Sequence, residues 1–253
     1  MVPAGLFVLG AILGSFLNVV AHRIPRGGSI VYPPSSCPAC GARIRPRDNI
    51  PVVSYLVLRG RCRDCGDRIS PRYLIVELLG GVVPVLLHAR YGFGRELFVF
   101  WALSDALIVL SAIDLADGIL PDRITLPGIV AGVVIAALAG IVSLPSSLLG
   151  AVIGGGGLYL VALLGAAAFR KESMGGGDIK LGAMLGAFLG WQLTIMMLFA
   201  SFLLGAIVGG AVMAKKGRDW DRSVPFGPFM AAGAFLVILW GQKLLGWYLG
   251  RLG

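Results

Sequence analysis

Long apolar runs constrain this chain more than any other feature. Hydrophobic residues make up 57% of its 253 positions and charged residues 14%, a balance unlike that of a soluble domain. Because a helix needs about 20 apolar residues to cross a bilayer, we count about eight candidate spans. They cover residues 3–21, 73–90, 96–113, 124–142, 147–169, 179–191, 192–214 and 227–249, of which 179–191 is short for a regular span. The sequence therefore predicts an all-α polytopic membrane protein.

The arginines are distributed unevenly, and this predicts an orientation. Residues 22–72 hold ten arginines and three aspartates. Basic loops stay on the cytoplasmic side of a membrane, so we expect this segment inside the cell and the N-terminus outside. Residues 1–21 have no basic segment ahead of the apolar run, which favours a retained first span over a cleaved signal peptide. Most of the net charge of +9 lies in residues 22–72, and this favours a lipid bilayer over nucleic acid as partner.

All four cysteines lie in the 22–72 segment, in two pairs of the same spacing. Cys37 and Cys40 form the first pair, Cys62 and Cys65 form the second, and a glycine follows each pair. Such pairs about 20 residues apart are typical of a four-thiolate zinc site. Disulfides or free thiols are the alternative, but the cytoplasm is reducing. We expect structural Zn²⁺ in a small zinc-ribbon-like insert, because no histidine offers an exchangeable ligand.

Two aspartates stand where predicted spans meet the same membrane face. Asp114 ends the apolar run 107–113, and Asp178 follows Gly175-Gly176-Gly177. Ionisable residues are costly at membrane depth and are functional candidates there. Two carboxyls a few Å apart can share one proton, which is the arrangement of an aspartyl protease. Asp178 could instead cap the helix that follows it, although the glycines would let an extended peptide approach closely.

Other acids have simpler interpretations. Asp122 precedes an apolar run and fits a helix N-cap, and Asp117 precedes a glycine and fits a turn. Asp105 lies about 13.5 Å along an ideal helix from Asp114 and half a turn out of phase, so we expect it in a buried contact between helices. The role of Glu77, about one turn inside its predicted span, stays open.

An ordered set of motifs runs through the chain nearly end to end. They are Gly14-Ser15-Phe16-Leu17-Asn18-Val19-Val20, the two cysteine pairs, Asn49-Ile50-Pro51 with Ser54-Tyr55, Arg59-Gly60-Arg61-Cys62, Arg72-Tyr73 with Glu77, Asp114 with Leu120-Pro121-Asp122, Gly175-Gly176-Gly177-Asp178 with Lys180-Leu181, and Pro225-Phe226-Gly227-Pro228.

With these motifs the chain resembles the type 4 prepilin peptidases of type IV pilus and type II secretion systems. The resemblance implies a Gly-x-Gly-Asp intramembrane aspartyl protease with Asp114 and Asp178 as its catalytic pair. Such enzymes cut a short basic leader from prepilins and pseudopilins after a glycine, at the cytoplasmic face of the bacterial inner membrane. Members with the cysteine insert are credited with methylating the new N-terminal amine from S-adenosylmethionine. Gly175, Gly176 and Gly177 would then form a substrate-binding hinge.

The expected organisation has three parts: a first transmembrane helix at 1–21, a cytoplasmic zinc-binding insert with the four cysteines at 22–72, and a transmembrane protease core at 73–253. Two other classes compete with the protease. A proton- or ion-coupled transporter also uses intramembrane acids and broken glycine-rich helices, but it predicts acids near the midplane, where only Asp105 fits. A zinc-ribbon membrane scaffold without activity leaves the aspartate pair unexplained.

Overall fold

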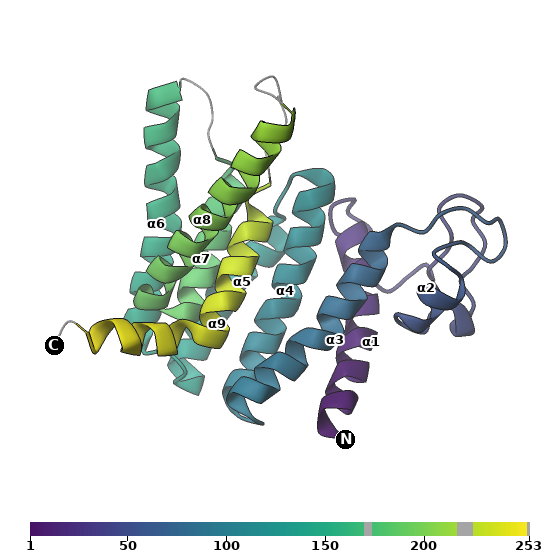
Figure 1. Cartoon of the computed structure of the whole chain (residues 1–253), viewed down its shortest axis with the longest axis horizontal. Coiled ribbons are helices and arrows are strands. Elements are labelled where there is room, and N and C mark those ends of the chain that lie inside the picture. Colours follow the sequence, from purple (N-terminus) through teal and green to yellow (C-terminus); the bar gives the residue numbers. More distant parts are fainter. Residues whose placement is uncertain (170–173, 217–224, 252–253) are drawn as a thin grey trace. The chain divides into compact units, whose positions relative to one another are not determined.

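The computed structural model describes residues 1–169, 174–216 and 225–251, and the described part is helical without strands (Figure 1). Eight longer helices occur in it. They are α1 Val2–Arg23, α3 Pro71–Tyr91, α4 Arg95–Asp117, α5 Asp122–Ala139, α6 Leu144–Phe169, α7 Gly176–Leu189, α8 Trp191–Lys216 and α9 Gly227–Leu249. Between α1 and α3 the chain forms only a 3-10 turn, η1 Pro46–Asp48, and a short helix, α2 Val53–Val57.

The predicted all-helical membrane fold is confirmed. Among the described residues, seven helices are long and apolar enough to cross a bilayer. Each of them coincides with a predicted span to within a few residues. The short predicted segment 179–191 corresponds to α7, which has 14 residues and reaches about 21 Å at 1.5 Å per residue. This is less than the hydrocarbon thickness of about 30 Å.

The chain divides into two compact units, Met1–Ile113 and Asp114–Gly253. In the first unit α1 packs closely along α3. A Cβ added to Gly14 would lie 2.9 Å from Glu77 Cα, and one added to Gly80 would lie 2.7 Å from the Gly10 carbonyl oxygen. Asn18 Nδ2 donates to the Tyr73 carbonyl at 3.1 Å and so joins α1 to α3. Glycines thus bring the two backbones together.

In the second unit α7 is the central helix, with contacts to α5, α6, α8 and α9. The face toward α6 is made of glycines. Gly182 lies against Gly154, and Gly186 lies against Gly150, so closely that an added Cβ would collide with the opposite backbone. Helices in lipid gain their stability from such close packing, because lipid chains are as apolar as the side chains. The glycines fix α7, and with it Asp178, against its neighbours.

Candidate active site and cysteine cluster

Asp114 lies in the last turn of α4 and is almost fully buried, with 6% of its surface exposed. Its carboxylate accepts a hydrogen bond from the backbone N–H of Gly227, the first residue of α9, at 2.9 Å. A helix N-terminus carries a partial positive charge. The positive end of α9 therefore stabilises the carboxylate of Asp114, which burial has removed from water.

Asp178 lies in the first turn of α7, whose N-cap is Gly175. The alternative interpretation of Asp178 as the cap is therefore wrong, because the helix begins at Gly176 and includes two of the three glycines. Burial, together with the negative charge of Asp114, raises the pKa of Asp178 to about 6, although a hydrogen bond from the Gly175 backbone opposes both effects. The two carboxyls therefore lie within direct electrostatic range of each other.

Leu120 packs against the N-terminus of α7, which carries Asp178, and against the N-terminus of α9, which binds Asp114. A Cβ added to Gly177 would lie 2.9 Å from Leu120 Cβ, and one added to Gly227 would lie 3.3 Å from Leu120 Cδ2. Larger residues at either glycine would push the helix away. The N-termini of α7 and α9 thus meet over one leucine beside Asp114.

The other acids stand apart from this pair. Asp122 is the first residue of α5, and its two carboxylate oxygens lie 2.7 and 2.8 Å from Lys180 Nζ. The cap interpretation of Asp122 is wrong: its side chain bonds to a lysine on another helix and makes no cap hydrogen bond. Asp105 has an oxygen that is buried without a hydrogen-bond partner in the described part of the chain, so the polar contact expected for it is absent there.

The four cysteines converge, as their spacing predicted. Their sulfur atoms all lie within 4.8 Å of one another, and no disulfide joins them. Each pair is built in the same way. The N–H of Cys37 donates to the Ala42 carbonyl at 2.9 Å, the N–H of Cys62 donates to the Asp67 carbonyl at 2.8 Å, and the following glycines have φ of 72° and 75°.

The sulfur geometry fits a four-coordinate metal. A tetrahedral site with Zn–S bonds of about 2.3 Å holds its sulfurs about 3.8 Å apart, and the Sγ atoms of Cys37 and Cys65 are 3.9 Å apart. A disulfide would need about 2.05 Å. The cluster could therefore bind a zinc ion.

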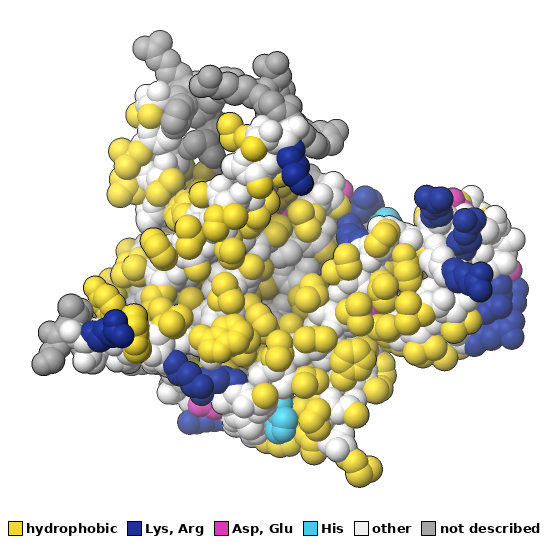
Figure 2. Space-filling model, viewed as in Figure 1, with side chains coloured by type: hydrophobic (Ala, Val, Ile, Leu, Met, Phe, Trp, Pro, Cys, Tyr) yellow, Lys and Arg dark blue, Asp and Glu magenta, His cyan; other side chains and the backbone are white. Residues whose placement is uncertain are grey.

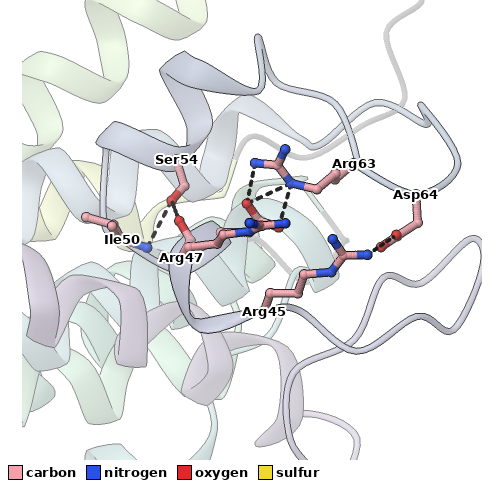
Figure 3. Close-up of polar contacts among 7 residues, drawn as sticks. Arg45, Arg47, Ile50, Ser54, Arg63 and Asp64 are labelled. Atoms are coloured by element: carbon pink, nitrogen blue, oxygen red, sulfur yellow. Dashed lines mark hydrogen bonds and ion pairs between the residues drawn. The ribbon is translucent and has the colours of Figure 1, made fainter.

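Ion pairs reinforce the polypeptide around the cluster (Figure 3). Arg63, between the second pair of cysteines, donates to both carboxylate oxygens of Asp48 at 2.7 to 3.0 Å. These bonds hold the pKa of Asp48 below its usual range. Arg45 contacts Asp64 at 2.9 Å. Both bridges join the first half of the insert to the second.

Sequence reasoning missed three features of the site. It recognised Gly227 as part of a motif but could not assign its hydrogen bond to Asp114, because the two residues are far apart in the chain. It also missed the hydrogen bond from Val52 N to Glu77 Oε2, which is 2.7 Å long. The third feature is a repeat of Cys-x-x-Cys-Gly-x-Arg-Ile at 37–44 and 62–69, which was visible in the sequence.

Comparison with known families agrees with this geometry. The sequence model of the Bacterial Peptidase A24 N-terminal domain matches residues 8–91, and that of the Type IV leader peptidase family matches residues 101–210. A Pseudomonas putida protein named prepilin leader peptidase/N-methyltransferase is 37% identical over 97% of this chain and 93% of its own length. The chain belongs to the type IV leader peptidase family. The resemblance predicted from the motifs is therefore confirmed.

Other relatives carry the same name. One from Aeromonas hydrophila is 36% identical over 96% of this chain and 92% of the relative, and one from Myxococcus xanthus is 42% identical over 86% and 65%. No solved structure matches the chain. The similarity to these relatives extends through both the cysteine insert and the aspartates.

Replacement of Gly227 by alanine tests the support of Asp114. An added Cβ would lie 2.7 Å from Asp114 Oδ2, so the carboxylate must move. Because a shift of about 1 Å in a reacting group can cost about 100-fold in rate, we expect Gly227→Ala to lower peptidase activity by at least about tenfold. Turnover and thermal unfolding in detergent would be measured together.

Gly246→Ala is the matched control, because Gly246 lies on the same helix and an added Cβ there meets no atom within 4 Å. It should keep full activity. Full activity in Gly227→Ala would show that the contact with Gly227 does not position Asp114.

Proposed function

We propose that Asp114 and Asp178 form the catalytic pair of a peptidase that removes the basic leader from prepilins and pseudopilins. The observation that carries this proposal is the packing of Leu120 against both Gly177 and Gly227, which brings the first turn of α7, with Asp178, close to Asp114 at the N-terminus of α9. The names of the relatives supply the substrate class.

The chemistry follows from a pair that holds one proton. The ionised carboxylate takes a proton from a water molecule, which attacks the scissile carbonyl carbon, while the protonated carboxyl donates to the carbonyl oxygen. The tetrahedral intermediate then collapses, the C–N bond breaks, and the leaving amine receives a proton from the pair. The helix N-termini at Gly227 and Gly175 stabilise the negative charge. The pair titrates as a unit.

The glycines before Asp178 are proposed to receive the cut site. Gly175 has an extended backbone with φ −73° and ψ 148°, and an added Cβ at Gly176 would meet nothing within 4 Å. An unwound substrate segment can therefore approach the backbone of Gly175 and Gly176 closely, whereas Gly177 is already packed on Leu120. The basic segment after α1 supports a site at the cytoplasmic face of the inner membrane.

We further propose that Cys37, Cys40, Cys62 and Cys65 hold structural Zn²⁺. The sulfur separations support this proposal. The insert also has almost no buried apolar side chains, so it lacks the apolar core that would otherwise stabilise it. The ion would cross-link the two halves of the insert, which the Arg63–Asp48 and Arg45–Asp64 pairs also join. A small domain without a sufficient core needs such a staple.

The second proposed activity is N-methylation of the new terminal amine. The names of the relatives support it, and S-adenosylmethionine would supply the methyl group. The chain would bind the new amine and the methyl donor, and we propose that the cysteine insert takes part in this step. A transporter has no support in the comparisons, and a scaffold without activity gives no reason for the aspartate pair.

Each aspartate can be tested by an amide. We expect Asp114→Asn and Asp178→Asn each to lower prepilin cleavage by about 10²- to 10⁴-fold, because an amide cannot exchange the proton that a general acid and base must pass. Purified enzyme and a prepilin would be followed by mass spectrometry of the product.

Asp122→Asn and Asp105→Asn are the matched controls, since both acids lie outside the pair. They should retain activity, and all four variants should keep their helical circular dichroism. Substantial turnover by either Asp114→Asn or Asp178→Asn would refute the assignment.

The cysteine cluster can be tested through one ligand. We expect Cys40→Ser to lose zinc, measured as metal per chain, and to lower methylation more than cleavage, because the aspartates stand on separate helices. Ser36→Ala, beside the first cysteine, is the control and should keep both metal and methylation. Equal loss of both activities in Cys40→Ser would assign the insert to the peptidase or to the whole fold instead.

A further inference from the structure

The outer face of α2 is apolar and exposed. Val53, Leu56 and Val57 have 52, 62 and 69% of their surface exposed. Their spacing of i, i+3 and i+4 places them on one side of a helix. Ile50, just before α2, is exposed too. A surface of this kind on a small water-exposed domain would be costly, and it indicates an apolar environment.

The opposite face of α2 is occupied by polar contacts that fix its direction. Ser54 is buried, accepts a hydrogen bond from the Ile50 N–H at 3.0 Å and donates to the Arg47 carbonyl at 3.0 Å (Figure 3). Tyr55 donates its hydroxyl to the Ile69 carbonyl at 3.3 Å. The helix therefore cannot turn its apolar face inward without losing these bonds.

A hydrogen bond fixes the level of α2 along α3. Val52, immediately before α2, donates its N–H to Glu77 Oε2 at 2.7 Å. Glu77 lies about 9 Å inside α3 from Pro71, at about 1.5 Å per residue. Figure 1 shows α2 beside α1 and α3 rather than beyond their ends. The apolar face thus stands level with the exposed Ile75 and Leu78 of α3, on a helix that crosses the bilayer.

Basic side chains border the apolar face. Arg59 and Arg61 follow α2 directly and are both exposed. In Figure 2 the insert, at the right, gathers its arginine side chains along its upper and outer side and hydrophobic side chains along its lower edge. Apolar residues below arginines match the boundary between acyl chains and anionic headgroups.

We propose that α2 is an interfacial membrane anchor: its apolar face, formed by Ile50, Val53, Leu56 and Val57, lies in the acyl-chain boundary of an anionic bilayer, with Arg59 and Arg61 on the headgroups. The occupant of this face is lipid. The insert is therefore held against the bilayer at α2 as well as at its two ends, and its cysteine cluster keeps a fixed height above the membrane.

The test places a photo-crosslinking amino acid, benzoylphenylalanine, at Val57 of the full chain in vesicles of phosphatidylethanolamine and phosphatidylglycerol. Ile75, on α3, is the lipid-facing control, and Asp67, exposed just after the second cysteine pair, is the aqueous control. After irradiation, the mass of the intact protein reports lipid adducts. We expect the adduct yield at position 57 to approach that at 75 and to exceed that at 67 by about fivefold.

A yield at position 57 no higher than at 67, or adducts there mainly with a second copy of the chain or with added prepilin, would overturn the anchor. A separate variant tests the role of the arginines. Arg59→Gln with Arg61→Gln should lower the share of phosphatidylglycerol among the adducts at 57, and an unchanged share would remove the role of the headgroups. The readout needs no enzyme activity, so its failure would be distinct from failure of the peptidase assignment.

Discussion

The hydrogen bond from Gly227 N–H to the buried carboxylate of Asp114 is the interaction on which the site depends. A negative charge among apolar helices is costly unless a polar group meets it. Here the first turn of α9 meets Asp114, and the first turn of α7 carries Asp178 next to the Gly175 backbone. Two helix N-termini therefore support two acids. A side chain at position 227 would occupy the space of the carboxylate.

Glycines also hold α7, the helix that carries Asp178, in place within the second unit. The helix α7 is too short to cross a bilayer unaided, and it is held by close backbone contact between Gly182 and Gly154 and between Gly186 and Gly150. The insert is stabilised differently. It has almost no apolar core, and two ion pairs and the Val52–Glu77 hydrogen bond cross-link it. The proposed zinc ion would add a further cross-link through the four sulfurs. The chain thus uses close packing inside the bilayer and polar cross-links beside it.

Features set by local pattern could be predicted from the sequence. Apolar runs predicted the helices, since the length of a span is dictated by the bilayer, and the spacing of Cys37, Cys40, Cys62 and Cys65 predicted their convergence. Features set by contacts distant in the chain could not. Asp178 precedes an apolar run and so fits the N-cap of the following helix, yet α7 begins two residues before it, at Gly176. Asp122 suits a cap too, but Lys180 from another helix takes its carboxylate.

The pH dependence of prepilin cleavage by the purified enzyme tests the shared pair most directly, with circular dichroism to confirm folding at each pH. In the proposed mechanism the active form carries one proton on two carboxyls, so the rate should fall at low pH as the second proton binds and at high pH as the last one leaves. The alkaline limb should lie well above the usual aspartate pKa of about 3.9, because the pKa of Asp178 is raised to about 6. A rate that rises through one titration and then stays level to alkaline pH would contradict the shared proton.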